Sequence, residues 1–239
     1  YDYVSLDDDP GDPNGHGTHV AGIIAATQDN NLGIAGMSWG AKVLAIRVCG
    51  ERGSCDNFGV AAGIAEAIAK GARVVNLSLG GAGDSCPAPF MALAQLAAAK
   101  EVLLVAAAGN SAQRKNPTTY PAACDGYLGV GATSTQDEWA PFSNHGPYVD
   151  VAAPGVGIWS TVPADRSPPS TPGFAAFSGT SMAAPHVSAL AALLFSAHPE
   201  WSADEVATRI METAVDLGRP GRDGYFGMGR ISVLRALTG

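Results

Sequence analysis

The sequence predicts an α/β fold, with a doubly wound, mostly parallel sheet and helices on both faces. Two observations indicate this. Strand-like and helix-like segments alternate along the chain, as the units of such a fold do. The strand-like segments are also apolar at nearly every position instead of every second one. Runs of that kind are typical of strands covered on both faces, as they are in parallel sheets.

The elements follow from these runs in chain order. Strands are expected at residues 42–48, 73–79, 102–108, 127–132 and 148–152. Helices are expected at residues 57–70, 88–100, 180–197 and 202–214. The last helix opens with Ser202 and Glu205 in the spacing of a capping box. The Pro-rich stretch 163–172 is expected to form a surface loop, and no linker divides the chain, so residues 1–239 are expected to form a single domain.

Composition excludes several classes of protein. The chain has 14 Lys and Arg against 22 Asp and Glu, a net charge of −8, which argues against binding to nucleic acid or to an acidic membrane. Charged residues make up 15% of the chain, below the roughly 25% usual in soluble domains, as in a dense globule. The longest apolar run, 102–108, is far shorter than the ~18 residues that span a bilayer.

Three polar clusters fall at strand ends or helix starts, where ligands bind in parallel sheets. They are NGHGTHVAG at 14–22, AAGNS at 107–111 and GTSMAAPH at 179–186. A Ser at a helix start exposes its hydroxyl near the positive end of the helix. A His at another helix start can serve as its general base, and an Asn amide can donate to a developing oxyanion. The combination favours nucleophilic catalysis on a carbonyl group.

Together these segments, with NLSLGG at 76–81, resemble the successive signatures of the subtilisin-like serine proteases in order and spacing. The resemblance covers nearly the whole chain and implies a serine endopeptidase that works through an acyl-enzyme. Carried over residue by residue, it makes Ser181 the nucleophile, His16 the general base and Asn110 the side-chain oxyanion donor. Because no third ligand or neighbouring Glu accompanies His16 and His19, a zinc site is not expected, and His19 is predicted to be structural.

The resemblance also implies a substrate cleft. Two edge segments would sandwich an extended peptide between them, formed by Gly53, Ser54 and Cys55 on one side and by Ser78, Leu79, Gly80 and Gly81 on the other. The pocket for the residue before the scissile bond would be lined by Ala107, Ala108, Gly109 and Thr119. Its small neutral walls predict broad specificity with a preference for large apolar or aromatic side chains.

The third member of the triad is not found where the family places it. None of the acidic residues between Asp2 and Asp12 follows a buried strand, and the chain starts at Tyr1 without an initiator Met. We therefore expect an N-terminally incomplete domain whose first, Asp-bearing strand lies outside this sequence, in an N-terminal fragment or another chain. The alternative is a catalytically silent peptide-binding module that keeps the groove and lacks the carboxylate.

The N-terminal loop of residues 1–12 is rich in Asp, and clustered carboxylates are typical ligands of a structural calcium ion. Thermitase-like members of the family bind calcium there, and the resemblance names the ligands Asp2, Asp7, Asp9 and Asp12, with Asn30 at a second site. A solvated acidic loop is the alternative.

Four cysteines, Cys49, Cys55, Cys86 and Cys124, without a Cys-x-x-Cys pair indicate disulfides and an oxidising compartment. Of the three pairings, Cys86 with Cys124 would tie two loops and Cys49 with Cys55 would close a short turn; buried free thiols are the alternative. We expect a secreted monomer that acts on protein or peptide substrates, with a pro-segment as a further partner.

Overall fold

The computed structural model describes all 239 residues and confirms the α/β class. Four parallel strands form the central sheet in the order β1-β3-β5-β6: β1 (Val74–Leu77), β3 (Leu103–Ala107), β5 (Tyr127–Thr133) and β6 (Val151–Pro154). The central strands β3 and β5 are buried at every residue. This explains why their sequences are apolar without alternation.

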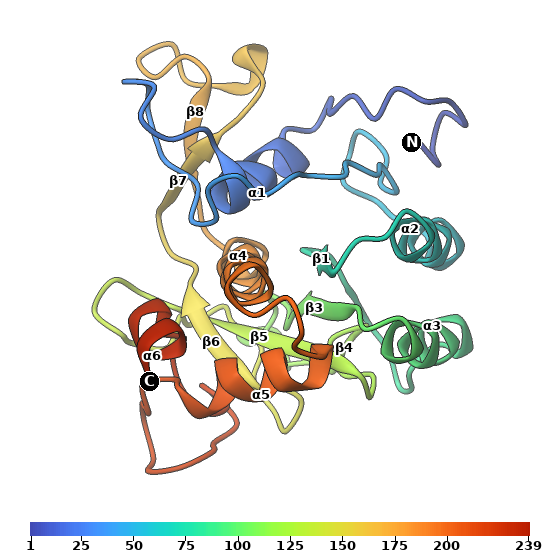
Figure 1. Ribbon diagram of the computed structural model, residues 1–239. Helices are drawn as coiled ribbons and strands as arrows, with labels where there is room; N and C mark the ends of the chain where they lie inside the picture. Colours follow the sequence, from blue (N-terminus) through green and yellow to red (C-terminus); the bar gives the residue numbers. More distant parts are fainter.

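Helices cover both faces of the sheet (Figure 1). On one face lie α2 (Asn57–Ala69) and α3 (Ala88–Ala99), which pack on Leu77, Leu104 and Ala106. On the other face lie α4 (Thr180–Ala197) and α5 (Ala203–Glu212), which pack on Leu103, Val105 and Val130. Adjacent residues of β3 therefore point into two separate apolar cores. The predicted capping box of α5 is present.

The helix α4 is the central helix of the fold. It contacts all four strands of the sheet as well as α1 (His16–Ala25). By length and composition alone it passes as a membrane span, but 67% of its residues are buried inside the protein. Its position in the core explains its apolar character. Its first turn contains two residues of the third polar cluster, Thr180 and Ser181.

Smaller elements complete the chain and were not predicted. They are β2 (Gly81–Ala82) paired with β4 (Thr119–Tyr120), the hairpin β7 (Ile158–Thr161) with β8 (Phe174–Phe177), and α6 (Val233–Thr238). The Pro-rich stretch 163–172 lies in the β7–β8 connection, which contains a 3₁₀ turn at Ala164–Arg166. The predicted strand at 148–152 starts later, at Val151.

The prediction of a strand at residues 42–48 is wrong, because the structure has no strand there. Val43 and Leu44 are about half exposed, at 49% and 48%, and the backbone of the segment bonds only to Tyr1 and Tyr3, through Ala45 and Arg47. Ile46 and Val48 lie against Gly63 of α2, so the segment is extended and packed without belonging to the sheet. The reason is that no strand lies between it and β1, which is the edge of the sheet.

Candidate active site

Ser181 lies in the first turn of α4, as the sequence predicts. Its Oγ donates to the carbonyl oxygen of Ser78 at 3.2 Å, and the Ser78 hydroxyl donates back to the carbonyl oxygen of Ser181 at 2.7 Å. This pair joins the C-terminal end of β1 to the N-terminal end of α4. The hydroxyl of Ser181 is half-buried, and its own N–H belongs to the first helical turn, where backbone donors have no intrahelical partner.

His16 is the first residue of α1 and follows Gly15, which has a φ of 89° that favours glycine. Its imidazole makes no hydrogen bond within the chain, in contrast to the other helical histidines. Burial lowers the pKa of His16, while the nearby carboxylate of Asp12 raises it. Asp12 makes no hydrogen bond to the ring; its oxygens accept from the backbone N–H groups of Asn14, Gly15 and Thr18 at the start of the helix.

Asn110 follows β3 and is held by α4. Its Oδ1 accepts from the N–H of Thr180 at 2.8 Å and from the hydroxyl of Thr180 at 3.0 Å. With the oxygen fixed in this way, the Nδ2 group has no partner within the chain and is exposed at the surface. The amide thus presents two N–H donors at the start of α4, beside Ser181.

One cleft of about 1860 Å³ brings these groups together. Ser181, His16 and Asn110 all line it, and it continues between the segment 42–48 and β1. Along that continuation the walls come from α1, α2 and α4, with apolar side chains such as Ile24, Ile64 and Phe195. The cleft therefore has a polar end at the signature residues and a long apolar end beside the open edge of β1.

The predicted substrate residues line the same cleft with one exception. Members that line it are Gly53, Ser54, Cys55, Ser78, Leu79, Gly80, Gly81, Ala107, Gly109 and Thr119. Ala108 is fully buried and does not line it. The exposed loop 53–55 is closed by a disulfide at Cys55, whereas 78–81 runs from β1 into β2.

Comparison with known proteins agrees with this geometry. The sequence profile of the subtilase family matches residues 1–229. The chain belongs to the subtilase family. A thermophilic serine proteinase of Bacillus sp. strain AK1 is 42% identical over 238 residues, which make up the whole of this chain and 56% of that protein. Thermitase of Thermoactinomyces vulgaris is 40% identical over 238 residues, 99% of this chain and 80% of thermitase.

Solved structures show the same fold. A protease from Pseudoalteromonas arctica PAMC 21717 superposes with a TM-score of 0.81 at 34% identity, covering 93% of this chain and 70% of that one. The chain spans only about half the length of the Bacillus sp. AK1 relative, 56% of it. Family membership is therefore established by the comparisons, whereas the chemistry performed by this chain is inferred from its own residues.

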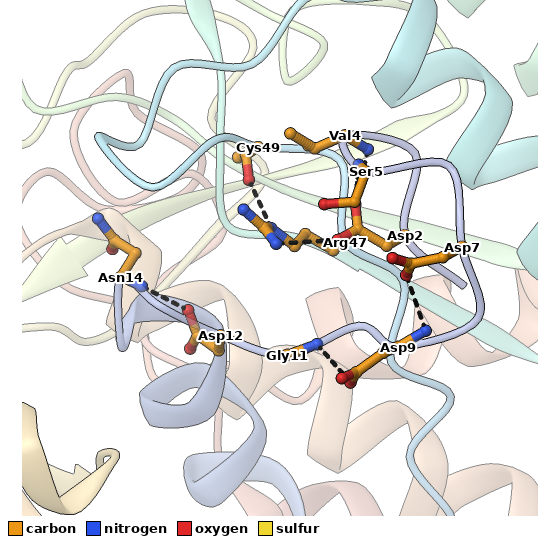
Figure 2. Close-up of polar contacts among 10 residues, drawn as sticks. All are labelled: Asp2, Val4, Ser5, Asp7, Asp9, Gly11, Asp12, Asn14, Arg47 and Cys49. Carbon is orange, nitrogen blue, oxygen red and sulfur yellow. Dashed lines mark hydrogen bonds and ion pairs between the residues drawn. The ribbon is translucent and has the colours of Figure 1, made fainter.

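The acidic loop of this subtilase does not assemble the predicted calcium ligands (Figure 2). Asp2 is buried and paired with Arg47, with 2.8 Å between Oδ2 and Nη1. Asp7 and Asp9 accept from the backbone N–H groups of Asp9 and Gly11, and Asn30 accepts from Leu32. Asp2 and Asp12 satisfy donors of the protein in this arrangement, and calcium binding at the acidic loop and at Asn30 stays a prediction.

Both disulfides that the sequence allowed for are present. Cys49 pairs with Cys55, and Cys86 pairs with Cys124 across 38 residues of sequence. No cysteine is free. The histidine predicted to be structural is also confirmed: His19 is buried, and its Nε2 lies 3.0 Å and 3.1 Å from the carbonyl oxygens of Ile158 and Ala175.

Sequence reasoning missed one residue beneath this site. Asn144 lies in the connection between β5 and β6 and is fully buried, and its side chain bonds to Ser111, Pro117 and Thr119. Its sequence context, Ser143-Asn144-His145, is typical of a polar surface loop. Only the fold brings this loop under β3, so no local pattern could have indicated its role.

Proposed function

We propose that this subtilase is a secreted serine endopeptidase that acts through an acyl-enzyme at Ser181. The observation that carries the proposal is the convergence of Ser181, His16 and Asn110 on one cleft, with the amide of Asn110 fixed so that its N–H groups remain free. A hydroxyl, an imidazole and a preorganised donor are the three parts that acyl transfer requires.

In the proposed reaction Ser181 Oγ attacks the carbonyl carbon of the scissile peptide bond, and its proton passes to the imidazole of His16. The carbonyl oxygen becomes negative and accepts from Asn110 Nδ2 and from the N–H of Ser181. The proton then moves from His16 to the leaving amine as the C–N bond breaks. Water repeats the sequence on the acyl-enzyme, which releases the acid and restores Ser181.

The imidazole needs a carboxylate partner to fix its tautomer, and no carboxylate of this chain is bonded to it. We propose that this carboxylate arrives on a β-strand that occupies the apolar end of the cleft, parallel to β1. A parallel strand there would end where β1 ends, at Leu77 next to Ser78, and Ser78 lines the same cleft as His16. Its backbone would pair with the open edge of β1 and its side chains would meet apolar walls.

Substrate would bind as an extended strand between the loop 53–55 and the segment 78–81, held mainly through its backbone. The residue before the scissile bond would enter the pocket formed by Ala107, Gly109 and Thr119. These walls carry no charge, which favours large apolar or aromatic side chains over Lys and Arg. Two disulfides support an oxidising, extracellular location.

A fluorophosphonate probe tests the proposal directly. We expect covalent labelling of Ser181, because phosphonylation uses the same base and oxyanion donors as acylation. The measurement is the mass shift of the intact protein and of the peptide that contains Ser181. Ser181→Ala, and separately His16→Ala, should abolish labelling while the melting temperature stays close to that of the parent. A parent chain that folds and stays unlabelled would instead indicate the silent peptide-binding module.

The labelling rate should also depend on pH through His16. The base must be neutral, and since burial lowers the pKa of His16 from its ordinary value of 6.5, the neutral form persists to lower pH. We therefore expect the rate to fall on acidification with a midpoint below 6.5. Asp12→Asn removes the charge that raises this pKa and should move the midpoint lower still. A midpoint above 6.5 in the parent would contradict the assignment.

A further inference from the structure

Asn144 is a fully buried amide whose polar atoms are all bonded. Its Oδ1 accepts from the N–H of Ser111 at 2.6 Å. Its Nδ2 donates to the carbonyl oxygen of Pro117 at 2.8 Å and to the hydroxyl oxygen of Thr119 at 3.0 Å. Its backbone N–H donates to the carbonyl oxygen of Gly109 at 2.9 Å. Such a side chain, satisfied on every atom, specifies a single local arrangement.

The bonds of Asn144 fall on both sides of Asn110. Gly109 precedes Asn110 and Ser111 follows it, so the backbone on either side is tied to the same buried residue. From the opposite side, Thr180 holds the Oδ1 of Asn110. Thr180 of α4 therefore holds the side chain of Asn110, while Asn144 holds the backbone on either side of it. Asn144 itself does not line the cleft.

Thr119 and Asn144 pack closely against Gly109, the residue before Asn110. Gly109 has a φ of 108°, and a Cβ added there would lie 2.5 Å from Thr119 Oγ1 and 2.7 Å from Asn144 Nδ2. Thr119 is also a wall of the proposed specificity pocket. The same buried amide therefore connects the pocket to the proposed oxyanion donor.

We propose that Asn144 is a positioning residue that fixes the direction of the Asn110 amide and couples it to the specificity pocket, a role that rests on the proposed function of Asn110. An oxyanion donor is effective because its direction is set before the charge develops. Asn144 supplies that constraint from outside the cleft, through the two peptide units that flank Asn110.

The first test is the mobility of Asn110, which does not require an active protein. In the parent we expect the ¹⁵N order parameter of the Asn110 side-chain amide to be about 0.85, which is typical of rigid backbone. In Asn144→Asp it should fall below about 0.6, which is typical of flexible groups. Aspartate keeps the size of asparagine but cannot donate to Pro117 and Thr119. Asn144→Ser provides a second variant if the buried charge prevents folding.

Asn116→Asp is the matched control. Asn116 also uses both ends of its amide, accepting from the N–H of His145 at 2.9 Å and donating to its carbonyl oxygen at 2.7 Å, but its side chain has no bond to residues 109–111. Its backbone N–H donates to the carbonyl oxygen of Ser111 at 3.2 Å, and the substitution leaves that bond in place. It should destabilise the protein without loosening Asn110. An Asn110 amide that stays rigid in both Asn144 variants overturns the proposal, whatever the activity of the chain.

The second test is a double-mutant cycle on hydrolysis of a peptide anilide. Asn144→Asp should lower kcat by roughly 10- to 100-fold, as small misplacements of catalytic groups do, with little change in KM. In the Asn110→Ala background the same substitution should lower kcat less than about 2-fold, because the group it positions is gone. An equal loss in both backgrounds contradicts the role. A parent that folds with a rigid Asn110 and hydrolyses nothing contradicts only the proposed function.

Discussion

A strand that enters the cleft with an aspartate at its C-terminal end should raise the rate of Ser181 acylation by about 10⁴-fold over the same strand ending in asparagine. The reason lies in His16, whose imidazole has no hydrogen bond within the chain. A carboxylate there would hold the tautomer that accepts the Ser181 proton and stabilise the imidazolium that forms. The measurement compares the two strands, each fused through a flexible linker to Tyr1, by their rates of fluorophosphonate labelling.

The asparagine strand is the control for binding. Both strands fill the apolar end of the cleft, and each buried Val or Ile side chain contributes about 1.5–3 kcal/mol, so both should raise the melting temperature equally. Only the aspartate strand should accelerate labelling, and it should move the pH midpoint upward because an anion favours the charged imidazole. Equal stabilisation with equal labelling rates would mean that the strand completes the fold but not the catalytic site.

The sequence predicts the elements that depend on local signals. Runs such as 102–108 are apolar because both faces of β3 are buried, and Ser202 caps its helix through its own side chain. The positions of the candidate site residues in the fold also follow local signals, because each lies near the start of a helix or the end of a strand, where the polarity changes abruptly. Each of these features can be recognised from a stretch of about ten residues of sequence.

What the sequence could not predict depends on partners distant along the chain. The segment 42–48 has the composition of a strand, yet strand formation requires a neighbour with which to pair, and β1 lies on the far side of the cleft. Asp2 illustrates the same point, since its carboxylate is taken by Arg47, 45 residues away. The acidic cluster carries no local sign of this arginine, which only the fold brings to Asp2.

Replacing Asn110 with alanine should lower kcat by about 10²–10³-fold, the usual effect of losing one oxyanion donor. The amide is held by Thr180 and has free N–H groups, so its loss removes an interaction that forms fully only as the carbonyl oxygen becomes negative. Binding of the uncharged substrate gains little from it, and KM should change little. Steady-state hydrolysis of a peptide anilide separates the two constants.

The background without the nucleophile shows whether this effect belongs to acyl transfer. If Asn110 stabilises the tetrahedral intermediate formed by Ser181, then Asn110→Ala should lower the rate by a smaller factor in the Ser181→Ala background than in the parent, since residues that act as one unit are not additive. A loss of similar size in both backgrounds would assign Asn110 to the structure of the strand end. In that case the donors of the cleft would reduce to the N–H groups at the start of α4, and the proposed mechanism would have to operate with the backbone donor alone.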